Sequence, residues 1–280
     1  MVSEPQMTCV YVVGGSEMHY QNLSRSLRSL RERGPVCDVL VVDLNGRLRS
    51  DNHRRVISGE GLIDPVRKLG FQFWKNKYSA CLHATTDYVF YLDTDTVFVN
   101  NTLGELIKKV GEGFGISKHW SVPTLRDFVE KVVPLENRGL LEGLLRDKLG
   151  VTGECEFVAS GAFLFRNSPA NRAILKQVLS FYEAIYPPGV DYIEGVTDEV
   201  FLSAALKSSG GAVFLSGALN HCVMGNSCMP LKYQNHVFYG RNPFEEKWEP
   251  VTLFHCYVTV DRSSQYGWWM RPKIRKALYF

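Results

Sequence analysis

Short apolar runs recur along the chain, and their lack of polar alternation predicts strands that are buried on both faces. The first run covers 8–13 and ends at Gly14-Gly15, and the second covers 36–44. Between them, leucines at helical spacing predict a helix over 20–33, which ends at Gly34-Pro35. A strand, a glycine turn, a helix and a second strand form a βαβ unit, so this part of the sheet is expected to be parallel.

The rest of the chain continues to alternate strands and helices. The expected elements are a polar loop over 45–61, a helix that begins at Pro65, a strand over 88–99, a helix over 103–110, a helical insertion over 111–153, a strand over 157–165, helices over 170–185 and from Thr197, and strands over 212–215 and 251–260. No internal repeat or low-complexity linker separates these elements. We therefore predict a single α/β domain over 1–280.

Composition and charge exclude several classes of protein. The chain has 280 residues, of which 45% are hydrophobic and 22% are charged, as in ordinary globular proteins. A net charge of +3 gives no general argument for a nucleic-acid partner. The N-terminus lacks the basic region of a signal peptide, and every apolar stretch is far shorter than the roughly 20 residues that span a bilayer. We expect a soluble, cytoplasmic protein without a membrane span.

The seven cysteines suggest free thiols rather than a cysteine site. Their number is odd, and no Cys-x-x-Cys pair occurs. The closest pair, Cys222 and Cys228, has five residues between its members. This usage argues against a zinc or redox site and suits a reducing compartment.

Two carboxylates interrupt the most apolar strand, YVFYLDTDTVFV over 88–99. Asp93 and Asp95 are two residues apart, so on a strand both side chains would leave the same face. Two neighbouring like charges in an apolar segment are costly unless a positive group compensates them. A divalent cation such as Mg²⁺ or Mn²⁺, bridging a diphosphate, would do so with oxygen ligands. The alternative is that one carboxylate caps a turn and the other is solvated.

Several segments, in their order along the chain, resemble the GT-A glycosyltransferases, which use nucleotide-sugar donors. The resemblance rests on Val10–Gly15, FQFWKNKYSACL, the strand that ends in Asp93-Thr94-Asp95, ASGAFLFRN at 159–167, the helix start Thr197-Asp198-Glu199 and TLFHCYV at 252–258. It covers most of the chain. It implies a Rossmann-like GT-A fold with a mixed, mostly parallel sheet, a nucleotide-binding half over 1–100, and an acceptor- and metal-completing half over 154–280.

Within that family, the chain most resembles soluble enzymes encoded by chloroviruses, including a xylosyltransferase that builds capsid glycans. This resemblance implies a metal-dependent transferase that moves xylose from UDP-xylose to a hydroxyl of an acceptor glycan. It also implies the host cytoplasm as the location. The oligomeric state stays open.

The resemblance assigns the nucleotide and the metal to two strand ends. The base would lie against the backbone of Val12, Val13 and Gly14. The metal would lie on Asp93-Thr94-Asp95, with Asp95 as a direct ligand and Asp93 reaching the ribose, or the metal through water. His255 is the expected third ligand, because imidazole is acceptable to Mn²⁺. The alternative for His255 is a core histidine that is bonded to backbone.

Further residues are expected around the diphosphate and the sugar. Lys75 and Lys77 precede the Asp-Thr-Asp strand, and one of them could neutralise a phosphate or bond a sugar hydroxyl. Arg262, in a basic tail, could close over the diphosphate. The small residues Ser160-Gly161-Ala162 would let a sugar ring lie against the backbone, or glycine there could only allow tight packing.

Asp198 and Glu199 are the candidate catalytic carboxylates. An inverting transfer needs a base that takes the proton from the acceptor hydroxyl, and the resemblance places that base at Asp198, with Glu199 second. A retaining enzyme could use the same position to orient the sugar. Acids in a first helical turn also stabilise a helix without any catalytic role.

Two other classes of function stay open. The string YLDTDTVFV also fits the motif of haloacid-dehalogenase phosphatases, with Asp93 as nucleophile, Asp95 as acid/base and Ser216 in the second motif. The motif then comes later in the chain than usual. The second alternative is a protein that binds a nucleotide sugar or a glycan without catalysis, using some of its five tryptophans and thirteen tyrosines.

Overall fold

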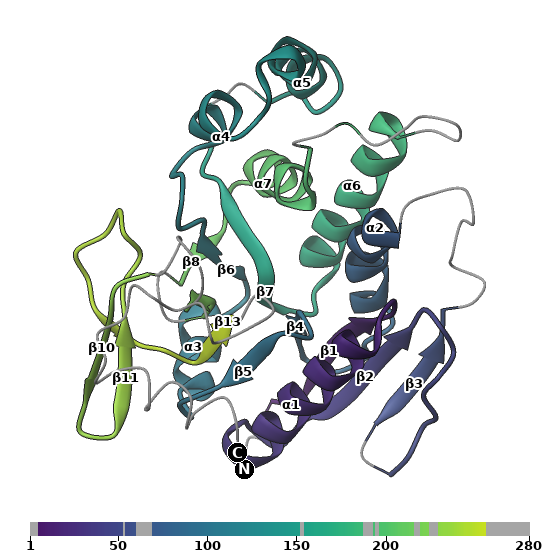
Figure 1. Ribbon diagram of the computed structural model, residues 1–280, viewed down its shortest axis with the longest axis vertical. Helices are drawn as coiled ribbons and strands as arrows, with labels where there is room; N and C mark the ends of the chain where they lie inside the picture. Colours follow the sequence, from purple (N-terminus) through teal and green to yellow (C-terminus); the bar gives the residue numbers. More distant parts are fainter. Residues whose placement is uncertain are drawn as a thin grey trace.

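The protein is described by a computed structural model, which covers residues 5–52, 54–59, 69–151, 154–186, 193, 196–215, 219–223 and 229–255. Across these residues, seven strands form one central sheet in the order β3-β2-β1-β4-β7-β6-β8 (Figure 1). Their bounds are β1 Met7–Val13, β2 Asp38–Asp43, β3 Arg55–Ser58, β4 Tyr88–Leu92, β6 Phe114–Lys118, β7 Val158–Arg166 and β8 Val213–Phe214. Within this sheet β7 runs antiparallel to both of its neighbours, and the other paired strands are parallel. The predicted mixed, mostly parallel α/β sheet is confirmed.

Helices cover both faces of the sheet, because the central strands are apolar on both sides. The helices are α1 Glu17–Arg33, α2 Leu69–Cys81, α3 Leu103–Val110, α4 Leu125–Lys131, α5 Leu135–Asp147, α6 Pro169–Ile185 and α7 Asp198–Ser208. In β1, Val10 and Val12 face the core that α2, α6 and α7 cover. Tyr11 and Val13 face the core that α1 and α3 cover. Both layers are visible in Figure 1.

Two small sheets attach to this frame. One contains β5 Thr96–Phe98, β13 Leu253–His255 and β9 His221–Cys222, and the other contains β10 Leu231–Gln234, β11 Val237–Gly240 and β12 Glu249–Pro250. In the first, β13 runs antiparallel to β5, and His255 pairs with Thr96. This pairing brings a segment from late in the chain directly beside the end of β4.

The predicted strand over 88–99 is wrong at its centre. It divides into β4 and β5, and Asp93, Thr94 and Asp95 form a turn between them. The Asp93 N–H donates to the Gly161 carbonyl at 2.8 Å, and the Thr96 N–H donates to the Asp93 carbonyl at 3.2 Å. The turn lets β4 pair with β7 while β5 leaves the central sheet to pair with β13. The two carboxylates therefore come together through a turn and not through strand alternation.

Two other segments differ from the expected elements. The helical insertion over 111–153 begins with β6, a strand of the central sheet, and only α4 and α5 are helical there. The polar loop over 45–61 contains the short edge strand β3. Both strands are short, and polar or glycine residues interrupt their apolar pattern. Pro65 and the end of the strand expected over 251–260 lie outside the described residues.

The helices expected near 20–33, 103–110, 170–185 and after Thr197 are confirmed as α1, α3, α6 and α7. Each begins beside Ser or Thr at the N-cap position, namely Ser16, Thr102, Ser168 and Thr197. In the part of the chain that the structure describes, no helix combines the length and the apolar character that crossing a bilayer requires.

Candidate active site

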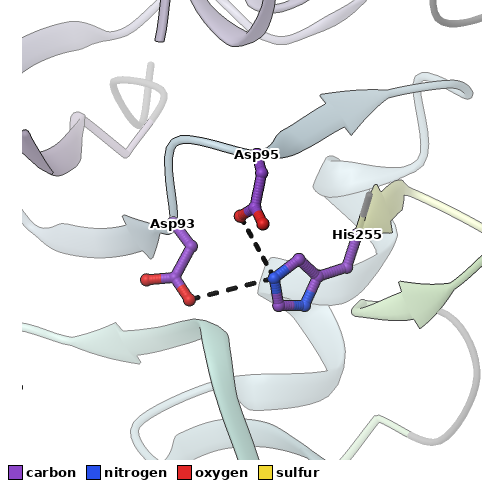
Figure 2. A group of neighbouring side chains, drawn as sticks. All are labelled: Asp93, Asp95 and His255. Carbon is purple, nitrogen blue, oxygen red and sulfur yellow. Dashed lines mark ion pairs between the residues drawn. The ribbon is translucent and has the colours of Figure 1, made fainter. Parts of the chain in front are cut away.

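Asp93, Asp95 and His255 converge at the end of β4 (Figure 2). The His255 Nε2 lies 3.1 Å from Asp95 Oδ1 and 3.9 Å from Asp93 Oδ2. One potential ligand atom from each residue lies within 4.8 Å of the other two. The expected clustering of these three residues is thus observed, with two side chains from the β4–β5 turn and the third from β13.

The chemistry of this cluster fits a divalent cation. Burial and the nearby Asp95 raise the pKa of Asp93, although Lys77 opposes that rise. Burial lowers the pKa of the His255 imidazole, but Asp95 and Asp93 raise it more, so the net pKa of His255 lies above its usual value. Two carboxylate groups and one imidazole form a mixed oxygen and nitrogen donor set that Mn²⁺ or Mg²⁺ accepts. These three residues would hold the ion.

Gly161 of β7 makes room for the His255 ring. A Cβ at position 161 would lie 2.7 Å from His255 Nδ1 and 3.2 Å from Asn220 Nδ2. Such contacts are too close for the ring to stay where it is. Gly161 therefore lies against the imidazole, and its expected contact with a sugar ring stays a prediction. Asn220 is fully buried, and its side-chain amide has no hydrogen-bond partner among the described residues.

Lys77 connects the Asp93 turn to the start of α7. Its Nζ lies 2.9 Å from Asp198 Oδ2 and 3.5 Å from Asp93 Oδ1, and its side chain is 5% exposed. It also donates to Ser160 Oγ at 3.0 Å. Burial alone would lower the pKa of Lys77, but Asp198, Asp93 and Glu199 raise it above its usual value. Lys77 is therefore a fixed cation beside the candidate metal centre.

The two candidate catalytic carboxylates have different surroundings. Asp198 is 3% exposed, and its Oδ2 accepts a hydrogen bond from the Tyr78 hydroxyl at 3.0 Å in addition to the Lys77 contact. Glu199 is half-buried, and its Oε1 accepts a hydrogen bond from Ser160 Oγ at 3.1 Å. Burial, and next the charge of Asp198, raise the pKa of Glu199 to about 7. The Glu199 carboxyl therefore holds its proton to a higher pH than an ordinary glutamate does.

Hydrogen bonds connect the glycine turn after β1 to the end of β2. The Gly15 N–H donates to Asn45 Oδ1 at 2.6 Å, and the Leu44 N–H donates to the Val13 carbonyl at 2.8 Å. Val12 and Val13 are buried, with their side chains in the two cores, and both residues pair with β2. The ends of β1, β2 and β4 share the carboxyl edge of the parallel sheet, where α/β folds bind ligands.

The other predicted residues lie in varied places. Lys75 pairs with Glu183 of α6 at 3.3 Å on the exposed surface. Thr94 is half-buried in the turn between the two aspartates. Ala162 is fully buried in the core beneath α1 and α3 and offers no surface to a ligand. Arg262 lies outside the described residues.

Several aromatic residues around the site were missed by the sequence analysis. The Tyr91 hydroxyl donates to Asp93 Oδ1 at 2.6 Å, and Tyr78 holds Asp198. The Trp120 ring meets the His255 ring edge-on at 6.2 Å, and it stacks on His119 at 4.5 Å. Only Tyr91 lies in an apolar run, and none of the three residues belongs to a local motif, so no signal in the sequence marked these contacts.

Comparisons with known proteins support the fold. No family model matches the chain, and no curated protein matches it in sequence. The galactosyltransferase LgtC, solved in complex with donor and acceptor sugar analogues, is 15% identical with a TM-score of 0.57, over 98% of this chain and 97% of LgtC. The bifunctional glycosyltransferase WbbM is 12% identical with a TM-score of 0.53, over 80% of this chain and 41% of WbbM.

Mouse xyloside xylosyltransferase 1 is also similar in structure. It is 12% identical with a TM-score of 0.50, over 91% of this chain and 98% of the mouse protein. At such low identities the likeness concerns the fold alone. The chain has the mixed α/β fold of the GT-A glycosyltransferases, with a mainly parallel central sheet.

Proposed function

We propose that this protein is a metal-dependent glycosyltransferase that moves a sugar from a UDP-sugar to a hydroxyl of an acceptor glycan. The observation that carries the proposal is the Asp93–Asp95–His255 cluster at the carboxyl edge of a GT-A sheet. A bound Mn²⁺ or Mg²⁺ would supply charge neutralisation for the diphosphate leaving group. Fold likeness alone would not support a transferase, because folds host many functions.

The residues around the cluster supply the other parts of such a site. The backbone of Val12, Val13 and Gly14 would lie against the base of the donor. Lys77 contributes a fixed positive charge beside Asp93. Because Asp198 is buried and already accepts from Lys77 and Tyr78, the geometry favours Glu199 over Asp198 as the group that takes a proton from the acceptor. Asp198 would then position Lys77.

The stereochemical course depends on how Glu199 acts. As a base toward the acceptor hydroxyl, it gives inversion at the anomeric carbon. If it only orients the donor sugar, the same site is compatible with retention. Comparing the anomeric configuration of donor and product by NMR separates the two mechanisms.

The donor sugar is the finer part of the proposal. UDP-xylose is the first donor to test, because of the resemblance to chlorovirus xylosyltransferases, and the similar mouse structure is named for xylosyl transfer. The similar LgtC is named for galactosyl transfer, so UDP-galactose belongs in the same panel. Viral origin and a cytoplasmic location stay predictions, as do the two functional halves over 1–100 and 154–280.

The test is a panel of UDP-sugars, each scored for UDP release with and without Mn²⁺. We expect one donor to be turned over only with the metal, and Asp95→Asn to abolish that turnover. Asp147→Asn is the matched control, because Asp147 lies on the exposed surface of α5. Phosphate release from an aryl phosphate, without UDP-sugar turnover, would favour the phosphatase alternative. Donor binding with neither hydrolysis nor transfer would favour a binding protein.

A further inference from the structure

Cys9 and Cys37 lie in contact in the amino-terminal part of the parallel sheet. Their Sγ atoms are 3.4 Å apart and share a hydrogen bond. Cys9 belongs to β1, and Cys37 directly precedes β2, the strand that pairs with β1. The sequence separation of 28 residues hides this pair from a search for Cys-x-x-Cys motifs.

The two thiols differ in their access to solvent. Cys9 is fully buried, whereas Cys37 is half-buried. A cavity of about 750 Å³ lies beside them, and Cys37 lines it while Cys9 does not. A small reagent that enters the cavity therefore meets Cys37 before the fully buried Cys9.

We propose that Cys9 and Cys37 form a reversible dithiol site, in which a small peroxide oxidises Cys37 and Cys9 resolves the product to a disulfide. The Cys37 thiolate attacks one oxygen of the peroxide, the O–O bond breaks, and Cys37 becomes a sulfenic acid as one water leaves. The Cys9 sulfur then attacks the Cys37 sulfur, and the sulfenic oxygen leaves as a second water. Two thiols and one hydrogen peroxide thus give one disulfide and two waters.

The surroundings of Cys37 suit the first step. The hydrogen bond with Cys9 lowers the pKa of Cys37, although its partial burial opposes this effect. Burial raises the pKa of Cys9, so Cys9 keeps its proton while Cys37 reacts. The thiolate is the reactive form of cysteine, so the more accessible of the two is also the more reactive.

The described contacts of this pair do not involve the candidate active site. Neither thiol contacts Asp93, Asp95, His255 or Lys77 in the described part of the chain. The dithiol proposal can therefore be tested independently of the proposed glycosyl transfer. The competing explanation is that the two cysteines are only small apolar residues that pack together.

Treatment of the folded full-length protein with hydrogen peroxide separates these explanations. After alkylation and tryptic digestion without reductant, we expect peptides 1–25 and 34–47 to be joined, with a mass two hydrogens below their sum. Cys155→Ser, at a buried cysteine elsewhere in the fold, should leave this cross-link unchanged. Oxidation of Cys37 to sulfinic or sulfonic acid without any cross-link would overturn the proposal, and so would a different cysteine pairing.

Two variants test the order of the steps. Cys9→Ala should stop the reaction at the sulfenic acid, which dimedone then labels at Cys37. Cys37→Ser should leave Cys9 resistant to peroxide and to alkylation, because Cys9 itself is fully buried and position 37 no longer carries a sulfur. If Cys9→Ala does not fold, the half-buried Cys37→Ser variant and the unaltered protein still decide the question. Rapid oxidation of Cys9 in Cys37→Ser would contradict the proposed order.

Discussion

The Lys77 ammonium lies 2.9 Å from the Asp198 carboxylate, and the two side chains are 5% and 4% exposed. Removing one member of a buried ion pair leaves the other charge without compensation, which costs about 3–5 kcal/mol. Lys77→Met should therefore lower the free energy of unfolding by about that amount, measured by urea denaturation. Adding Asp198→Asn to Lys77→Met should recover part of the loss, because the unpaired charge disappears.

Lys75→Met is the matched control on the same helix. Lys75 pairs with Glu183, and these side chains are 47% and 67% exposed. Exposed pairs contribute about 0–1 kcal/mol, so this variant should unfold almost like the unaltered protein. If the losses in the free energy of unfolding from Lys77→Met and from Asp198→Asn instead simply add in the double variant, the two residues are not energetically coupled.

Much of the frame could be predicted from the sequence, because helical periodicity and caps are local signals. The helices α1, α6 and α7 follow directly from such signals. The strands β3 and β6 could not be predicted, since their place in the sheet depends on partners far away in the chain. Local pattern alone does not show which short segments will pair into a sheet.

The grouping of Asp93, Asp95 and His255 was predicted correctly, but through strand alternation instead of a turn, and their role as metal ligands stays a prediction. Residue type indicated Asp93, Asp95 and His255, and these are close together in space. The turn that joins β4 to β5 was not predicted, because the apolar run continues through it. The contacts of Tyr78 with Asp198 and of Gly161 with His255 join residues far apart in the chain, so no local pattern predicts them.

The close approach of Gly161 to the His255 ring predicts a loss of metal affinity in Gly161→Ala. The added methyl would occupy space within 2.7 Å of His255 Nδ1, so the ring must move away from Asp95. Disturbing the support of a metal-ligating histidine typically weakens binding about 10–100-fold. Titration with Mn²⁺, followed by electron paramagnetic resonance of the free ion, measures this change without substrate.

Gly104→Ala provides the control for Gly161→Ala. Gly104 lies in α3, and a Cβ there would meet nothing within 4 Å. Alanine favours a helix over glycine by roughly 1 kcal/mol, so this variant should be slightly stabilised and bind Mn²⁺ normally. Unchanged Mn²⁺ affinity in Gly161→Ala would show that His255 does not bind the ion from its present position.

Metal binding to the folded protein should also raise its thermal stability. A ligand that binds only the native state adds about 2.7 kcal/mol at a concentration 100 times its dissociation constant. The Tm should rise with Mn²⁺, return after chelation, and fail to respond in Asp95→Asn or His255→Gln. His83→Gln, at an exposed histidine after α2, should keep the full response. An equal rise of Tm in all these proteins would place the ion elsewhere.

Glu199 should make the stability of the metal-free protein depend on pH. Its pKa is raised to about 7 in the folded protein, by burial and next by Asp198, with Lys77 opposing; in an unfolded chain a Glu pKa is about 4.3. Between these values the folded protein holds a proton that the unfolded chain has lost, so the free energy of unfolding falls as pH rises from about 4 to about 7.

Glu199→Gln keeps an acceptor for Ser160 and removes the titration. The variant should therefore show a flatter pH dependence across this window and become more stable above it, by an amount on the order of 1–3 kcal/mol. Comparing the two proteins by urea denaturation at several pH values isolates Glu199 from other carboxyl groups, since Asp93 also has a raised pKa and titrates in both. Parallel curves would mean that Glu199 is already ionised at low pH, and that solvent reaches it more freely than its contacts with Ser160 and α7 imply.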